Sequence, residues 1–587
     1  MIRSSANLNA LWCNLLVEEL VRNGVDQFCI SPGSRSTPLT LAAANNKWAK
    51  TSLFYDERAA AYFATGFARA TGKPAVLICT SGTAVANFLP AVVEAAAANI
   101  PLIILSADRP AELRDTGANQ TISQPNIYGD YIRWHFDLPC PTLEITPQFV
   151  LTTIDQAIYQ ATRNPAGPVH LNCMFREPLA PLENDTVNRV DFAGLEKWLD
   201  ATSPFTSYVP GECKMSPDSV KKAAISINSS ISGLVILGEM RSEKDQQSAV
   251  KFCRELNWPV ALDIQSGLRL QNLDEPFLPF FDQLLYSEEF IGNFKPDTVI
   301  QLGDRLVSKK LAQFIAHADL ENYILVANHP FRRDENHKIS LRFELPVAVF
   351  CESLQSHLIF SQPPEKINAA HSLTASHLTS YFEKMVELNE LFLARTLSEI
   401  IPENSGLFLG NSMPIRDMNT VAGLPGKNIK IAANRGASGI DGNLATAVGF
   451  AAGLHTPVTV LIGDLATLHD LNSFYLLSQT HEQIITIISN NHGGGIFNFL
   501  PVAQTTEHFE PFFGTPHSLN FQRAAQMFSL DYKCVTTHDA FVESYQLFVA
   551  STKSAIIEVE TSRDKNWQLH RKLQKQVAAS VDKFFQD

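Results

Sequence analysis

A chain of 587 residues, of which 45% are hydrophobic and 18% charged, is too long for a single core and predicts about three or four folded domains. That composition excludes wholesale disorder. The net charge of −13 argues against a nucleic-acid-binding protein, which needs a basic face, but it does not exclude anionic small molecules, because arginines can cluster locally.

The first segment, residues 1–24, predicts an amphipathic helix and not a signal peptide, because Asn14 and the Glu18-Glu19 pair interrupt its apolar residues. The longest apolar runs elsewhere have the length of a strand, so we expect no membrane span. The nine cysteines are scattered, without a CxxC or Cys/His spacing, which favours reduced thiols and a cytoplasmic location.

Along the rest of the chain, short β-like runs alternate with helical stretches rich in alanine and leucine. This alternation predicts an α/β protein with doubly wound parallel sheets. Residues 175–217 and 360–377 break the alternation with proline and polar residues and are predicted to connect domains. We therefore expect three domains, at residues 1–185, 210–360 and 375–587.

The middle domain is expected to contain buried strands at residues 234–237, 259–263, 298–302 and 323–327. It lacks a GxGxxG sequence, so a dinucleotide site has no support there. A structural role is the better interpretation of this domain.

The outer domains share an internal similarity. Shifting residues 62–108 forward by 383 positions, without a gap, aligns two helices and two strands. It also superposes identical residues, Ala64, Gly66, Phe67, Ala68 and Pro74, on positions 447, 449, 450, 451 and 457. We interpret the outer domains as related copies, although two generic α/β repeats would also explain the pattern. The shift places Ser81 over Asp464. It also places Asp108 over Asn491, at a strand end, where open α/β sheets bind ligands.

Polar residues follow two predicted strands of the third domain. Asp464 ends one strand, and Asn491 follows the next, residues 484–489, just before Gly493. Mg²⁺ prefers oxygen ligands, which Asp464, Asn491 and a backbone carbonyl near Gly493 can supply. The helix after Asp464 can direct N–H groups at a diphosphate. Each motif alone would more often be a helix cap or a flexible turn.

Together, at this spacing, these residues resemble the GDG and NN motif of thiamine-diphosphate-dependent enzymes, with Leu465 in place of the second glycine. The resemblance implies thiamine diphosphate and Mg²⁺ (or Mn²⁺) as cofactors. It also implies that Glu57, which precedes a helix predicted at residues 59–70, hydrogen-bonds the cofactor's aminopyrimidine ring and, with a raised pKa, shuttles a proton to it. The alternative for Glu57 is an acid that favours the helix dipole.

Five further motifs narrow the resemblance. They are SPGSRSTPL at residues 31–39, SADRP at 106–110, GANQ at 117–120, GNS at 410–412 with Arg416, and NRGASGIDG at 434–442. They resemble the 2-succinyl-5-enolpyruvyl-6-hydroxy-3-cyclohexene-1-carboxylate synthases of menaquinone (or phylloquinone) biosynthesis. This family implies a pyrimidine-binding, a central and a diphosphate-binding domain. It also implies a homodimer or homotetramer with active sites between subunits.

The reaction implied is decarboxylation of 2-oxoglutarate and 1,4-addition of the resulting carbanion to isochorismate. Both substrates are dicarboxylates, which arginine binds well. The resemblance implies substrate-binding roles for Ser34, Arg35, Arg109, Asn119, Gln120, Lys309, Lys310, Arg416 and Arg435, and catalytic roles for Glu57 and Arg35. It implies cofactor-binding roles for Glu57, Ser412, Ser438, Ile440, Asp464, Leu465, Ala466 and Asn491, and metal-binding roles for Asp464, Asn491 and Gly493.

Several alternatives stay open. The Lys309-Lys310 pair stands where the family often has Lys-Arg, and a solvated helix face explains it equally well because lysine lacks a planar fork. Another enzyme of the same superfamily, of the acetolactate-synthase type, would be distinguished by FAD. A binding protein with a degenerate cofactor fold would have lost Glu57, Asp464 or Asn491, and all three are present.

Overall fold

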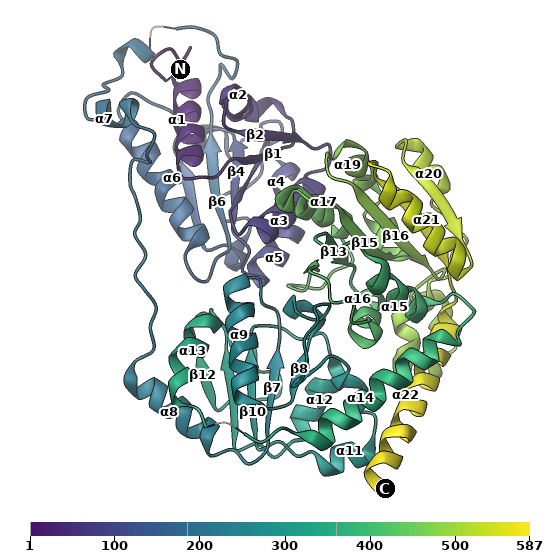
Figure 1. Cartoon of the computed structure of the whole chain (residues 1–587). Coiled ribbons are helices and arrows are strands. Elements are labelled where there is room, and N and C mark those ends of the chain that lie inside the picture. The colour runs from purple at the N-terminus through teal and green to yellow at the C-terminus, as the bar shows by residue number, and fades with distance from the viewer. Residues whose placement is uncertain (1, 185, 360) are drawn as a thin grey trace. The chain divides into compact units, whose positions relative to one another are not determined.

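The structure is a computed structural model that describes residues 2–184, 186–359 and 361–587. Its contacts divide the chain into two compact units. Unit 1 comprises Met1–Pro210, Asn434–Thr456 and His469–Glu482, and unit 2 comprises Gly211–Ala433, Pro457–Leu468 and Gln483–Asp587. The described residues form three parallel six-stranded sheets with helices, which confirms the predicted α/β class (Figure 1).

The first sheet belongs to unit 1. Its strands are β1 (Gln27–Ile30), β2 (Lys50–Leu53), β3 (Ala75–Cys79), β4 (Leu102–Asp108), β5 (Trp134–Leu138) and β6 (Pro168–Met174), in the order β2-β1-β3-β4-β6-β5. Its helices are α1 (Leu8–Arg22), α2 (Thr37–Asn45), α3 (Glu57–Thr71), α4 (Thr83–Asn87), α5 (Leu89–Ala97) and α6 (Pro147–Thr162). Strands β3, β4 and β6 are buried along their whole length, as expected for parallel strands covered on both faces.

The second sheet belongs to unit 2. Its strands are β7 (Gly233–Leu237), β8 (Val260–Leu262), β9 (Phe277–Leu278), β10 (Thr298–Leu302), β11 (Asn322–Val326) and β12 (Leu341–Phe343), in the order β12-β11-β10-β7-β8-β9. Its helices are α8 (Pro217–Asn228), α9 (Glu243–Leu256), α10 (Phe281–Leu284), α11 (Glu288–Asn293), α12 (Lys309–His317) and α13 (Val347–Leu354). The four predicted strands are confirmed; the edge strands β9 and β12 are too short to show a pattern.

The third sheet also belongs to unit 2. Its strands are β13 (Gly406–Leu409), β14 (Lys430–Ala432), β15 (Val458–Gly463), β16 (Ile484–Asn490), β17 (Asp531–Val535) and β18 (Ala555–Glu560), in the order β14-β13-β15-β16-β18-β17. The further helices of this unit are α14 (Glu365–Glu383), α15 (Glu390–Ile400), α16 (Met413–Val421), α20 (Gln522–Met527), α21 (His538–Ala550) and α22 (Arg563–Gln586), and α18 (Asp464–His469) begins in it. Two helices, α17 (Asn443–Leu454) and α19 (Phe474–Gln479), belong to unit 1.

One apolar core joins the second and third sheets of unit 2. Phe281 of α10, Leu391 of α15 and Leu573 of α22 are all part of it. The long helix α22 packs against α10, α11, α14 and α15. It therefore carries side chains from the C-terminal end of the chain into the interior of unit 2. Among the helices of the described residues, none has both the length and the apolar character needed to cross a bilayer.

The first and third sheets have the same strand order, 2-1-3-4-6-5 when the strands of each are numbered along the chain. This identity supports the interpretation of related copies. The middle sheet differs, with the order 3-2-1-4-5-6 read from its other edge. That order occurs in many nucleotide-binding folds, but fold alone does not establish a site.

The sheet register corrects one detail of the ungapped alignment. The pairing of β3 with β4 joins Cys79 to Ser106, and the pairing of β15 with β16 joins Ile462 to Ile488. A shift of 383 positions carries Cys79 onto Ile462, but it carries Ser106 one position beyond Ile488. The connection between the second pair of strands is therefore one residue shorter than the first.

As a result, the predicted correspondence of Asp108 with Asn491 is wrong, and Asp108 corresponds to Asn490. Each ends a buried strand and bonds the next strand of its sheet. Asn172 Nδ2 donates to Asp108 Oδ2 at 2.9 Å, and Asn490 Nδ2 donates to Glu558 Oε1 at 2.7 Å. Helix packing sets this register, so an ungapped comparison of letters could not detect the slip.

The connection after the first sheet stays attached to unit 1. It includes α7 (Glu196–Asp200), whose Trp198 donates its Nε1–H to the buried Glu19 carboxylate of α1 at 2.6 Å. Further along, the Phe205 N–H donates to Glu19 at 2.5 Å, and the Thr206 N–H donates to Asp155 of α6 at 2.8 Å. Two acidic side chains thus hold the connection against the sheet's helices.

The second predicted connection, residues 360–377, runs into a long helix. Phe360 lies outside the described residues, and α14 begins at Glu365, directly after Pro364. Proline favours a helix start because its φ is already fixed and its missing N–H is not needed there. Apolar side chains such as Ala370 and Leu378 then bury one face of the helix.

Candidate active site

Asp464 and Asn491 follow two adjacent strands of the third sheet, β15 and β16. Asp464 is 2% exposed, and burial raises the pKa of its carboxyl. Its Oδ1 accepts the Leu465 N–H at 2.7 Å, and its Oδ2 accepts the Gly493 N–H at 2.9 Å. His517 Nε2 lies 3.2 Å from the same Oδ2. The fold therefore brings the two predicted motifs into direct contact.

The two polar atoms of the Asn491 side-chain amide differ in their hydrogen bonding. Its Nδ2 donates to Glu390 Oε1 at 2.7 Å. Its Oδ1 is buried and has no hydrogen-bond partner among the described residues. Buried polar atoms are normally satisfied, so an orphan carbonyl oxygen beside a carboxylate indicates a cation ligand.

Gly493 lies where no other residue fits. Its φ is +148°, and a Cβ on it would overlap the carbonyl oxygen of Gly514. Within the described ranges, no group of three or more His, Cys, Asp or Glu side chains could hold a metal. The donors near Gly493 are one carboxylate, one amide oxygen and backbone carbonyls. This set fits Mg²⁺, which completes its shell with phosphate and water oxygens.

The helix after Asp464 is short. Helix α18 spans only Asp464–His469, and its Leu465 N–H already bonds the Asp464 carboxylate. A short helix has a weak dipole, so its expected attraction for a diphosphate is reduced. Leu465 is half-buried, and Ala466 is buried close to Asp464 in the chain.

A polar network that the sequence did not predict lies behind these residues. Glu390 is 5% exposed, and Asn566 Nδ2 of α22 donates to its Oε2 at 2.8 Å. His570, one turn further along α22, pairs with the buried Asp417 of α16 at 2.8 Å. Burial, together with the Asp417 carboxylate, raises the pKa of Glu390. No motif surrounds Glu390, and an acid at a helix start has an ordinary local explanation.

The NRGASGIDG segment lies in unit 1, where two further unpredicted side chains hold it. The buried Glu94 of α5 accepts the N–H groups of Gly436 at 2.8 Å and Ala437 at 2.6 Å. The Tyr62 hydroxyl of α3 donates to Asp441 Oδ2 at 2.6 Å. The sequence did hold a signal that could have identified Glu94 as a functional candidate, because it is the single acidic residue in the alanine-rich helix α5.

Two predicted cofactor residues lie within this held segment. Ser438 has a left-handed φ of +62°, and Ile440 is 39% exposed. An apolar side chain this exposed, on a segment anchored at several points, is placed to contact a ligand. Ser412, in unit 2, also has a positive φ, of +75°. Such strain in non-glycine residues is common at functional sites.

Glu57 is the first residue of α3. The preceding Asp56 caps the helix by accepting the Arg58 N–H at 2.9 Å, so the cap does not require Glu57. Glu57 is half-buried, and Asn87 Nδ2 donates to its Oε2 at 3.2 Å. The carboxyl is thus held but not fully enclosed.

Arg35 and Arg109 lie close together in unit 1. Arg35 is 8% exposed, and its guanidinium donates to the Phe175 carbonyl oxygen at 3.0 Å and pairs with Glu177 at 3.2 Å. Arg109 donates to Ser81 Oγ. Burial and the nearby charge of Arg35 lower the pKa of Arg109. The two guanidinium groups are therefore close enough for the charge of one to act on the other.

The remaining predicted substrate residues are distributed over both units. Ser34, Asn119 and Gln120 are exposed in unit 1, and Arg435 also belongs to unit 1. In unit 2, Arg416 of α16 donates to the Ser412 carbonyl oxygen at 2.5 Å. Lys309 and Lys310 begin α12, where Lys309 is exposed and the Lys310 ammonium lies 5.2 Å from the ring centroid of Tyr286.

Comparisons with known proteins show the family of this chain. Three family models match the chain: the thiamine pyrophosphate enzyme, N-terminal TPP binding domain (residues 13–127), the middle domain of thiamine pyrophosphate (191–409) and the thiamine pyrophosphate enzyme, C-terminal TPP binding domain (426–559). A protein of Rubrobacter xylanophilus is 44% identical over 96% of this chain and 98% of its own length. Proteins of Chlorobium phaeobacteroides and Salinibacter ruber are 43% and 41% identical over 99% of this chain, and over 100% and 98% of their own lengths. All three are named 2-succinyl-5-enolpyruvyl-6-hydroxy-3-cyclohexene-1-carboxylate synthase. The chain belongs to this synthase family.

Membership in the synthase family confirms the expected enzyme class, a thiamine-pyrophosphate-type transferase. The N-terminal model covers strands β1 to β4 of the first sheet, the middle model covers the second sheet and β13, and the C-terminal model covers most of the third sheet. The alternative of an acetolactate-synthase-type enzyme is not favoured, because the synthase relatives match nearly the full chain.

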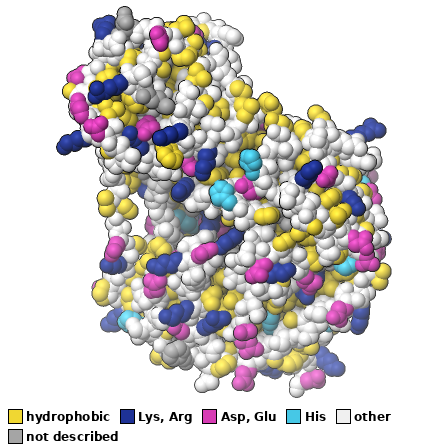
Figure 2. Space-filling view, turned by 45° about the horizontal axis from the view of Figure 1, so that its top comes forward, with side chains coloured by type: hydrophobic (Ala, Val, Ile, Leu, Met, Phe, Trp, Pro, Cys, Tyr) yellow, Lys and Arg dark blue, Asp and Glu magenta, His cyan; other side chains and the backbone are white. Residues whose placement is uncertain are grey.

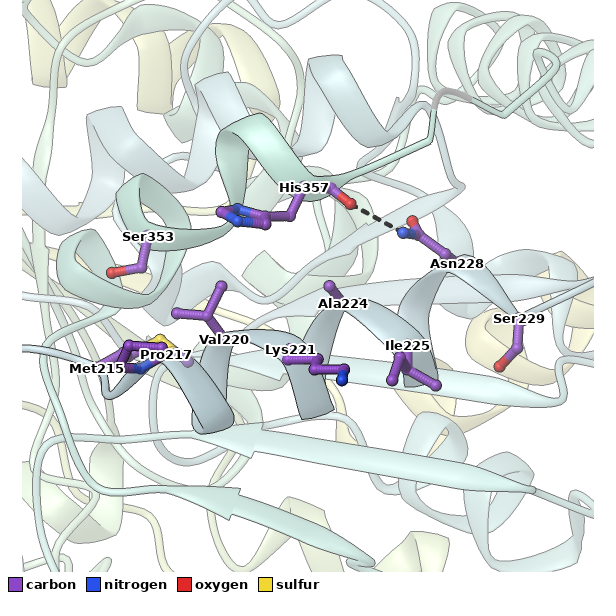
Figure 3. Close-up of a pocket in the computed structure, with 10 residues that line it drawn as sticks. All are labelled: Met215, Pro217, Val220, Lys221, Ala224, Ile225, Asn228, Ser229, Ser353 and His357. Carbon is purple, nitrogen blue, oxygen red and sulfur yellow. Dashed lines mark hydrogen bonds between the residues drawn. The ribbon is translucent and has the colours of Figure 1, made fainter.

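A groove elsewhere in unit 2 of this synthase does not belong to the site. It has a volume of about 840 Å³ and is lined by α8 and the end of α13, including Val220, Ile225 and Ser353 (Figure 3). None of the predicted site residues lines it. On the face shown in Figure 2, basic and acidic side chains are interspersed.

Proposed function

We propose that this synthase decarboxylates 2-oxoglutarate and joins the remaining succinyl unit to isochorismate by 1,4-addition, in menaquinone (or phylloquinone) biosynthesis. The products are CO₂ and the compound for which the relatives are named. One observation carries the proposal. Asn491 follows β16, the strand next to the one that ends at Asp464, and its Oδ1 is buried and has no partner among the described residues. The chain that carries this pair matches both TPP binding domains.

We propose a metal site of three oxygen donors: the Asp464 carboxylate, Asn491 Oδ1 and the Gly493 carbonyl. These residues would hold Mg²⁺ (or Mn²⁺) and, through it, the diphosphate. Leu465, Ala466, Ser412, Ser438 and Ile440 would contact the rest of the cofactor. Thiamine diphosphate, when bound, supplies the electron sink for loss of CO₂.

Glu57 is proposed to hold and transfer a proton at the cofactor's aminopyrimidine ring. Asn87 fixes Oε2 of its carboxyl, so Oε1 is the oxygen that exchanges the proton. The half-buried position favours a carboxyl that is neither fully solvated nor locked in an ion pair.

The substrates are proposed to bind through separate cationic groups. Arg35 and Arg109, with Ser34, Asn119 and Gln120, would bind isochorismate, and Arg35 would also assist catalysis. Arg416 and Arg435 would bind the distal carboxylate of 2-oxoglutarate, which pyruvate lacks. For Lys309 and Lys310, the exposure of the first and the ring contact of the second favour a surface role for at least Lys310.

The assembly and its setting are also proposals. We expect a homodimer or homotetramer in the cytoplasm, with domains at residues 1–185, 210–360 and 375–587. The separate TPP binding models at the two ends of the chain support a site that needs both ends.

An assay with 2-oxoglutarate and isochorismate, in the presence of thiamine diphosphate and Mg²⁺, tests the function. We expect CO₂ release and a product with the mass of the succinylated enolpyruvyl cyclohexene carboxylate. Flavin colour in the purified protein, or turnover of pyruvate in place of 2-oxoglutarate, would contradict the proposal. Asp464→Ala serves as the inactive control.

A further inference from the structure

Asn490 and Asn491 stand side by side at the end of β16, and each donates to a buried carboxylate from another element. Asn490 bonds Glu558 at 2.7 Å, and Asn491 bonds Glu390 at 2.7 Å. The two amides differ at their oxygen atoms. Asn490 Oδ1 accepts the His492 N–H at 3.1 Å, whereas Asn491 Oδ1 has no hydrogen-bond partner in the described part of the chain.

Glu390 meets hydrogen-bond donors on both of its oxygens. Oε1 accepts from Asn491 Nδ2 at 2.7 Å and from Thr561 Oγ1 at 3.3 Å. Oε2 accepts from Asn566 Nδ2 at 2.8 Å. The side chain is 5% exposed. It belongs to α15, which packs against α22, the helix that carries Asn566 (Figure 1). Its carboxylate is therefore fixed in position behind the Asn491 amide.

We propose that Glu390 is a positioning residue that orients the Asn491 amide and so presents Oδ1 to the divalent cation. This inference rests on the proposed metal site. Both Glu390 oxygens already act as acceptors, Oε1 from Thr561 Oγ1 and Oε2 from Asn566 Nδ2, so the end of Asn491 that pairs with Oε1 is its Nδ2 donor. A flipped amide would set two oxygens against each other and turn an N–H₂ group towards the cation.

Substitutions separate this role from general support of the fold. Glu390→Gln no longer fixes which end of the Asn491 amide faces position 390. The glutamine amide both donates and accepts, so it can pair with either end of Asn491. Asn491→Asp alone places two carboxylates in contact. In the double variant, the new glutamine donates to the new aspartate, whose second oxygen then faces the cation. The double variant therefore recovers what each single substitution loses.

Mn²⁺ binding, measured by electron paramagnetic resonance in enzyme with saturating thiamine diphosphate, tests the proposal without an activity assay. Glu390→Gln is expected to weaken Mn²⁺ binding about 10- to 100-fold, as for other residues that orient a metal ligand. Glu558→Gln is the matched control, because it removes the equivalent carboxylate from Asn490, whose oxygen is already occupied. The control and the double variant are expected to stay within about threefold of wild type.

The outcomes distinguish this inference from the proposed function. Unchanged Mn²⁺ binding in Asp464→Ala would overturn the metal site itself. Lost binding in Asp464→Ala with equal effects of Glu390→Gln and Glu558→Gln would overturn the role of Glu390 alone. Failure of the double variant to bind more tightly than Glu390→Gln, while its thermal unfolding matches that of Glu390→Gln, would also overturn it.

Discussion

Gly66 of α3 and Gly449 of α17 occupy equivalent positions in the two related segments, and each lies against the backbone of the other's helix. A Cβ on Gly66 would overlap the carbonyl oxygen of Thr446, and a Cβ on Gly449 would overlap the carbonyl oxygen of Phe63. Phe63 and Thr446 are themselves equivalent under the shift of 383 positions. The contact is thus reciprocal, as for two copies related by an approximate two-fold axis.

Gly66→Ala should destabilise unit 1, because the added methyl group meets fixed backbone and forces the helices apart. Overpacking of this kind costs about 1–3 kcal/mol. Gly292→Ala in α11 is the control, since a Cβ there meets nothing within 4 Å. The control should gain up to about 1 kcal/mol from its better helix propensity. Urea unfolding of both variants tests this prediction. Equal unfolding midpoints for Gly66→Ala and Gly292→Ala would contradict the close packing of α3 against α17.

Removal of divalent cations should abolish activity, and Mg²⁺ with thiamine diphosphate should restore it, because the proposed ligands are all oxygen atoms. The measurement is turnover before and after chelation and re-addition. Asp464→Ala should not recover. Full activity of that variant after chelation would exclude the proposed site.

Glu57→Gln should keep the fold but slow proton–deuterium exchange at C2 of the bound cofactor. A positioned acid–base group contributes about 10²–10⁴-fold, so the exchange rate should fall on that scale. NMR of the quenched cofactor measures it. Asp56→Asn is the control, because asparagine caps a helix equally well and the adjacent Glu57 is untouched. An unchanged rate in Glu57→Gln would assign the proton transfer to another residue.

Arg416→Ala should raise the KM for 2-oxoglutarate strongly and affect isochorismate less, and Arg35→Ala should do the reverse. Loss of one partner of a buried charge pair costs about 2–5 kcal/mol. Steady-state kinetics with both substrates tests this, with Arg176→Ala as a control because Arg176 is 57% exposed and pairs with Glu112. Identical effects on both substrates would show that the assignment of Arg416 to 2-oxoglutarate and Arg35 to isochorismate is wrong, even if the enzyme assignment is right.

The attachment of the first connection should weaken as pH rises. Burial, followed by the neighbouring Asp155, raises the pKa of Glu19 from 4.5 to about 8. The folded state therefore keeps a proton that the unfolded state releases, so stability is lost between pH 4.5 and 8, at no more than about 1.4 kcal/mol per pH unit. Unfolding midpoints at pH 5 and pH 8 should differ less in Glu19→Gln than in wild type. Glu18→Gln changes the neighbouring acid, which pairs with Arg22 and accepts from Asn46, and should retain the wild-type difference.

The sequence by itself determined the α/β class and the main strands of the middle domain, and it pointed to Asp464 and Asn491 as the proposed oxygen donors. Each of these depends on a few consecutive residues: an apolar run of strand length, followed by a polar side chain at the edge where open α/β sheets bind ligands. The strong motifs then led to the family that the comparisons confirm. Edge strands of two or three residues carried too little pattern to be predicted.

Only the tertiary structure decided which side chains support those donors. Glu390 is 101 positions from Asn491, and nothing in its local sequence separates it from an ordinary acid at a helix start. The equivalence of Asp108 with Asn490 likewise emerged only from the sheet register. The physical reason is the same in both cases: a hydrogen bond or a strand register depends on distances set by the packing of whole helices, and spacing along the chain does not encode those distances.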